Sequence, residues 1–105
     1  MSTKTAKSAA LRFLEKQIGG PLTLGALLQA IRLGDEISQS TFARTLGVSR
    51  SHLCDIEHNR KSVSLARALK FAKVLGYLED QFVRLALQAM VNEAGLALHV
   101  SVAAA

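Results

Sequence analysis

The sequence predicts an all-α fold, and three kinds of observation support this prediction. Apolar residues recur at helical spacing through most of the 105 residues. Serine or threonine precedes several of these segments and can accept a hydrogen bond from the first turn of a helix. Glycine follows several of them, where a left-handed residue ends a helix at low cost. The capping residues are Thr23, Ser38, Ser49 and Ser64, and the terminating glycines are Gly47, Gly76 and Gly95.

The stretch from Ser38 to Lys61 is the centre of the predicted fold. Ser38 can cap a helix from Gln39 to about Leu46, and Gly47 and Ser49 then end this helix and cap a second one. Two helices joined by a short turn with glycine form a helix-turn-helix motif. Side chains on the outward face of the second helix are mostly polar and can reach the edges of DNA bases. They are Arg50, Ser51, His52, Cys54 and Asp55.

These residues resemble those of the Cro and lambda-repressor type of helix-turn-helix regulators, the XRE family. The resemblance extends from about Leu24 to Leu78 and implies a five-helix, lambda-repressor-like DNA-binding domain. Asn59 stands where many relatives carry glycine, and asparagine also tolerates a left-handed conformation. The resemblance rests on Ser38-Gln39, Phe42-Ala43, Leu46-Gly47-Val48-Ser49-Arg50-Ser51, Leu53, Ile56-Glu57 and Arg60-Lys61.

The resemblance implies that the start of the second helix reads bases. Arg50 and Ser51 match the family's principal base-contacting positions, and an arginine can donate two hydrogen bonds to guanine. Asp55 matches a further reading position, where it either accepts a hydrogen bond from cytosine or repels the phosphates of wrong sequences. For His52, base contact, phosphate contact and idle exposure all stay open. Cys54 is expected to be a small filler at the edge of the groove rather than a redox sensor.

Phosphate contacts are expected to set the register without reading sequence. The resemblance carries Gln39 onto a phosphate-contacting position. The other expected phosphate ligands follow from their placement: Arg44, Asn59, Arg60 and Lys61. The resemblance also implies an ion pair between Arg32 and Glu57, and two independently solvated charges are the alternative.

Apolar stripes predict the helices that flank the motif. Thr23 caps a helix with Leu24, Leu27, Leu28 and Ile31 on one face, and Ser64 caps another with Leu65, Ala68, Leu69, Ala72 and Leu75. Its cations off that face either approach the DNA backbone or are merely solvated: Arg67, Lys70 and Lys73. A fifth helix from about Leu78 to Ala94 carries two stripes, one of Phe82, Leu85 and Ala89 and one of Val83, Leu87, Met90 and Val91. We expect a second subunit or a partner protein to cover one of them.

The segment LALHVSV, residues 96–102, alternates apolar and other residues as a β-strand does. We expect it to pair with the same strand of a second copy, because nothing else in the chain reads as a strand. The predicted organisation is therefore a basic extension with a short helix (1–21), a helix-turn-helix DNA-binding domain (22–78), and a fifth helix with a dimerisation strand (79–105). The short helix is expected from Ser8 to Ile18; the extension either follows DNA or meets a partner, or is a solvated arm.

Charge supports a nucleic-acid partner. The formal net charge is +5, and residues 40–75 hold seven basic and two acidic residues, while residues 76–105 hold one basic and three acidic residues. Positive charge placed on the motif is typical of a phosphate-binding surface.

Other classes of function find little support in the sequence. The three histidines are scattered without metal-ligand spacing, and no catalytic constellation or cofactor motif is present, so we expect neither an enzyme nor a metal site. A single cysteine, no apolar run of membrane-spanning length and no signal-type N-terminus favour a cytoplasmic protein.

Two biological roles share the predicted DNA-binding domain. The first is a homodimeric repressor that binds a double-stranded operator. The second is an antitoxin of a type II toxin-antitoxin system, which neutralises a toxin protein and represses its own operon. The segment from Phe82 to Val102 resembles the C-terminal part of HigA-like antitoxins.

Overall fold

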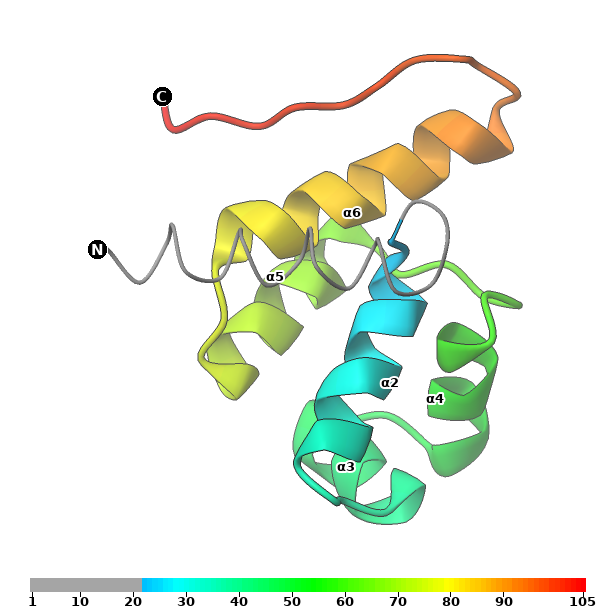
Figure 1. Cartoon of the computed structure of the whole chain (residues 1–105), viewed down its shortest axis with the longest axis vertical. Coiled ribbons are helices and arrows are strands. Elements are labelled where there is room, and N and C mark those ends of the chain that lie inside the picture. Colours follow the sequence, from blue (N-terminus) through cyan, green and yellow to red (C-terminus); the bar gives the residue numbers. More distant parts are fainter. Residues whose placement is uncertain (1–21) are drawn as a thin grey trace.

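Five helices follow one another in the computed structural model, which describes residues 22–105 (Figure 1). They are α2 (Leu24–Gly34), α3 (Gln39–Leu46), α4 (Arg50–Glu57), α5 (Leu65–Leu75) and α6 (Glu79–Glu93). The predicted five helices are confirmed, with α6 one residue shorter at each end than expected. The predicted basic extension and its short helix, residues 1–21, lie outside the described residues. None of the described helices is long and apolar enough to cross a membrane.

Side-chain caps start the first four of these helices, as predicted. Thr23 Oγ1 accepts a hydrogen bond from Ala26 N, and Ser38 and Ser49 do the same for the third residues of α3 and α4. Ser64 caps α5 in the same way. Gly47 ends α3 at φ 76°, a left-handed conformation that costs a residue with a side chain about 1–2 kcal/mol. These local signals fix where the helix-turn-helix begins, turns and ends.

One core lies between the helices. Its three largest residues are Phe42, Phe71 and Phe82, each at most 1% exposed. Phe71 corrects the predicted stripe of α5, because this helix turns Ala68, Phe71 and Ala72 inward and leaves Leu65 38% exposed. Helix α5 turns Phe71 inward in preference to Leu65 because a phenylalanine ring removes more apolar surface from water than a leucine side chain does.

The predicted C-terminal strand is wrong for the described residues, since no strand is assigned between 22 and 105. Residues 96–105 instead run back along α6 as an extended chain (Figure 1). The side-chain amide of Gln88 holds this segment: its Nε2 donates to Leu98 O at 2.9 Å, and its Oε1 accepts from Val100 N at 2.8 Å. A strand needs a ladder of hydrogen bonds from a neighbouring strand, and one amide side chain supplies only two.

Helix α4 packs against α2 through a close approach at Gly25. A Cβ atom added to Gly25 would overlap the carbonyl oxygen of Ile56 and lie 2.8 Å from Oδ1 of Asn59. The backbone of α2 therefore touches the last turn of α4 with no side chain between them. Only glycine permits this separation of the two helices.

A buried ion pair fixes the same two helices at a second point. Arg32 of α2 donates from Nε to Glu57 Oε2 at 2.8 Å and from Nη2 to Oε1 at 3.0 Å, which confirms the pair that the resemblance implied. The Glu57 side chain is 0% exposed and that of Arg32 13%. The hydrogen bonds from Arg32 to Glu57 raise the pKa of the guanidinium above its ordinary value. Gln39 of α3 adds a third hydrogen bond, from Nε2 to Glu57 Oε1 at 3.1 Å.

The close approach predicts a clear difference between two glycines of α2. Gly25→Ala should lower the free energy of unfolding by roughly 1–3 kcal/mol or more, because the new methyl group has to push α4 away from α2. Gly34→Ala is the matched control, since nothing lies within 4 Å of its added Cβ. That change should be neutral or stabilise by up to about 1 kcal/mol. Urea unfolding followed by circular dichroism measures both, and equal effects would contradict the close approach.

The buried ion pair predicts a strong asymmetry between single and double substitutions. Arg32→Ala should lower the free energy of unfolding by about 3 kcal/mol or more, because it leaves a buried carboxylate without its counter-charge. The double variant R32M/E57M should recover most of this loss, because it removes both charges and fills the space. Chemical denaturation compares the variants. A loss below about 0.5 kcal/mol for Arg32→Ala would mean that the two charges are independently solvated.

Candidate nucleic-acid interface

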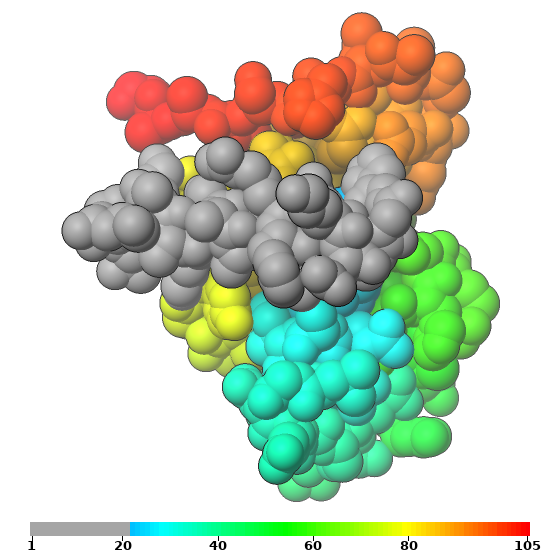
Figure 2. All heavy atoms as spheres, in the orientation of Figure 1, coloured from blue at the N-terminus to red at the C-terminus, as the bar shows by residue number. Residues whose placement is uncertain are grey.

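The helix-turn-helix forms one end of the molecule, and the C-terminal segment lies at the opposite end (Figures 1 and 2). Helices α3 and α4 meet at the turn of Gly47 to Ser49, where Val48 packs against the core. The inward face of α4 consists of Leu53, Ile56 and Glu57, all buried. Its opposite face therefore points to solvent, as the sequence predicted.

The predicted base-reading residues lie together on that outward face. Arg50 and Ser51 are exposed in the first turn of α4, and His52 and Asp55 are half-buried behind them. Ser49 caps the helix through His52 N, so the start of α4 is held in place. This arrangement presents a flexible cation and a short hydroxyl at the tip of a rigid helix.

Two of the predicted reading residues have intramolecular partners that the sequence did not indicate. His52 Nε2 lies 3.5 Å from Nη1 of Arg67, which comes from α5. Asp55 Oδ1 accepts from Arg60 Nε at 2.9 Å, and Asp55 Oδ2 lies 3.9 Å from Lys61 Nζ. The hydrogen bond from Arg60 is the main cause that lowers the pKa of the Asp55 carboxyl, with a partly opposing effect of desolvation and smaller effects of nearby positive charges.

The predicted phosphate ligands fall into three places. Gln39 lies at the start of α3 and donates one amide hydrogen to Glu57, which leaves the second hydrogen of its amide group for another acceptor. Arg44 is exposed in the last turn of α3. Asn59, Arg60 and Lys61 form the exposed loop after α4, and Asn59 has the predicted left-handed conformation at φ 59°.

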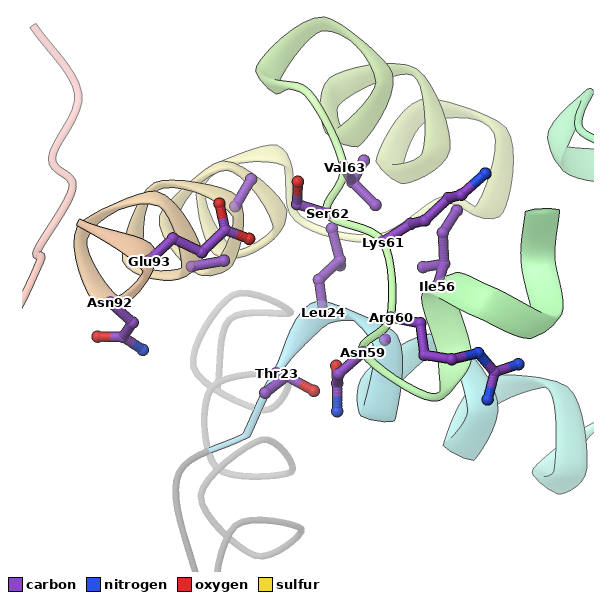
Figure 3. A pocket seen from close by; sticks show the side chains of 13 residues that line it. Thr23, Leu24, Ile56, Asn59, Arg60, Lys61, Ser62, Val63, Asn92 and Glu93 are labelled. Carbon is purple, nitrogen blue, oxygen red and sulfur yellow. The ribbon is translucent and has the colours of Figure 1, made fainter. Parts of the chain in front are cut away.

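A pocket of about 270 Å³ lies behind this loop, between the start of α2, the loop and the end of α6 (Figure 3). Arg60 and Lys61 do not close it: their side chains point away from Asn92 and Glu93 of α6 (Figure 3). Both cations are thus directed toward the side of α4 that carries Asp55.

Helix α5 adds two cations to the surface of the motif. From the sequence it was predicted only that they lie outside the apolar face of this helix. Arg67 reaches His52 of α4, and the ammonium group of Lys70 lies 3.1 Å from the position of a Cβ on Gly47. The sequence did contain a signal for this arrangement: Arg67 and Lys70 are about one helical turn apart, which puts both on one side of α5. The structure adds that this side borders the turn of the motif.

The free thiol of Cys54 lies on the rim of α4 beside two polar neighbours. Arg60 Nη2 donates to its Sγ at 3.4 Å, and His58 Nδ1 lies at 3.7 Å. Within residues 22–105, no group of three or more histidine, cysteine, aspartate or glutamate residues is placed to hold a metal ion.

Comparison with known proteins identifies the family. A family model described as "Helix-turn-helix" matches residues 28–82, which is more than half of the chain. No curated protein and no solved structure matches significantly. The matched residues contain α3, the glycine turn and α4 in full. The chain therefore belongs to the XRE-type helix-turn-helix family of DNA-binding transcription regulators.

Proposed function

We propose that the chain is a repressor that binds a specific duplex operator as a homodimer. The observation that carries this proposal is the exposed first turn of α4, with Arg50 at its tip and its far end pinned by the buried Glu57. A rigid helix with exposed polar side chains at its start suits insertion into the major groove, where all four base pairs can be told apart.

The base-reading and phosphate-binding roles divide along the motif. Arg50 and Ser51 read base edges, and His52 and Asp55 border them. Phosphate contacts come from both sides of α4, and the residues assigned to them are Gln39, Arg44, Asn59, Arg60 and Lys61. These residues all lie on α3 or on the loop after α4, which supports a backbone contact on each side of one groove.

The C-terminal segment supports the dimer part of the proposal. Peptide groups of alternate residues point to the same side of an extended chain, and those of Leu98 and Val100 point to Gln88. The backbone N–H and C=O of His99, which lies between them, therefore point away from Gln88 and can pair with a second chain. Leu96 and Leu98 are 51% and 60% exposed, and Met90 of α6 is 45% exposed, so a partner would also cover apolar surface.

Substitutions at Arg50 and Lys61 test the division of roles. Arg50→Ala should cost about 1–3 kcal/mol on the preferred duplex and relax the preference at one base pair. Lys61→Ala should weaken binding to all duplexes alike and reduce the salt slope by about one. Fluorescence anisotropy with duplexes selected from a random library, measured over a range of salt, gives both quantities. The proposal fails if the wild type prefers no duplex, and the assignment of Arg50 fails if both variants lose affinity uniformly.

Truncation after Gly95 tests the dimer. The shortened chain should fold, because its core lies entirely before this residue. It should be mainly monomeric and bind the operator much more weakly, because the two α4 helices are then no longer linked. Size-exclusion chromatography with light scattering decides the oligomeric state. A truncated chain that stays dimeric at micromolar concentration contradicts this role. The segment then either serves only to pack along α6 of its own subunit or is reserved for a toxin.

A further inference from the structure

Asp55 is the one solvent-accessible acidic residue in the stretch 40–75, all of which the structure describes. The only other acid there is Glu57, which is buried and paired with Arg32. Seven basic residues share this stretch. Asp55 therefore places a negative charge on the very helix that is proposed to approach DNA, and its position needs an explanation.

The loop after α4 is built around Asp55. Its carbonyl oxygen accepts hydrogen bonds from the backbone N–H groups of Arg60 and Lys61, at 2.8 and 3.3 Å. Its carboxylate binds the Arg60 side chain at 2.9 Å and lies 3.9 Å from the Lys61 ammonium. Asp55 thus contacts both the backbone of this loop and its two cations, which turn toward α4 and away from Glu93 (Figure 3). Cys54 Sγ accepts a further hydrogen bond from Arg60 Nη2 at 3.4 Å.

The ion pair of Asp55 and Arg60 is weak enough for another anion to replace the carboxylate. The side chains are 30% and 55% exposed, and exposed pairs contribute only about 0–1 kcal/mol. A phosphate oxygen is an acceptor of the same type as a carboxylate oxygen, and both form charge-assisted hydrogen bonds with a guanidinium. Asp55 therefore competes with the DNA backbone for Arg60 at little cost in stability.

We propose that Asp55 is a specificity-determining positioning residue, which acts as an internal substitute for phosphate and withholds Arg60 from DNA of the wrong sequence. This inference rests on the proposed DNA-binding function. Non-specific binding depends on the number of phosphates that cations neutralise. A complex without base contacts leaves Arg60 on Asp55 and lacks this phosphate contact. Docking on the operator brings α4 closer to the DNA and lets a phosphate replace the Asp55 carboxylate as the partner of Arg60. The difference between the affinity for the operator and the affinity for non-specific DNA therefore grows.

The test compares Asp55→Asn with Asp35→Asn. Both variants lose one negative charge, but Asp35 is an exposed residue at the C-terminus of α2, away from the loop. In D55N, affinity for a duplex of random sequence should rise about threefold or more near 0.1 M salt, and its salt slope should steepen by about 0.9, the value for one more phosphate contact. Affinity for the selected operator should change less, so the specificity ratio should fall. D35N should change the slope little.

A second pair of variants shows whether Asp55 acts through Arg60. D55N in an Arg60→Ala background should give no gain over R60A alone. The inference is overturned if D55N matches D35N, if the gain persists in R60A, or if D55N weakens the operator alone, which would make Asp55 a base-reading residue. Absence of DNA binding by the wild type would instead overturn the proposed function itself. Circular dichroism melts of each variant separate these outcomes from a loss of folding.

Discussion

The buried carboxylate of Glu57 is the constraint on which the rest of the motif depends. A charge removed from water needs partners, and here α2 supplies Arg32 and α3 supplies Gln39. Three helices thus meet at one group. These hydrogen bonds tie α4 to both α2 and α3, and the missing side chain of Gly25 lets α2 and α4 approach each other closely. The exposed face of α4 is consequently held at a defined angle.

The two acidic residues of α4 have different roles because they are buried to different extents. Glu57 is fully buried, and its ion pair is permanent because breaking it would strand a charge. Asp55 lies two residues earlier on the other side of the helix, and its ion pair is partly exposed to water. Water weakens that pair enough for phosphate to replace it. A carboxylate–arginine pair therefore fixes the position of α4 at Glu57, whereas at Asp55 such a pair controls whether Arg60 is available to DNA.

The ends of the domain are built on different principles. At the helix-turn-helix end, side-chain caps, the glycine turn and buried contacts hold the backbone of α3 and α4, so polar side chains face outward. At the other end, residues 96–105 carry exposed leucines and few backbone hydrogen bonds, and the amide of Gln88 holds them along α6. A side-chain amide has the same donor and acceptor as a peptide group and can take the place of one strand residue. It cannot replace the whole ladder of a neighbouring strand.

The sequence by itself determined the helices and their limits, because caps such as Ser38 and stops such as Gly47 act within a few residues of the chain. It also indicated the outward face of α4, and the family resemblance implied the pair of Arg32 and Glu57. Tertiary structure alone decided which distant groups meet: Gly25 with Ile56, Arg67 with His52, and Gln88 with the C-terminal segment. The alternating pattern of residues 96–102 predicted a strand that the described chain does not contain. A pattern records which side chains prefer to alternate, whereas a strand exists only where another backbone supplies its hydrogen bonds.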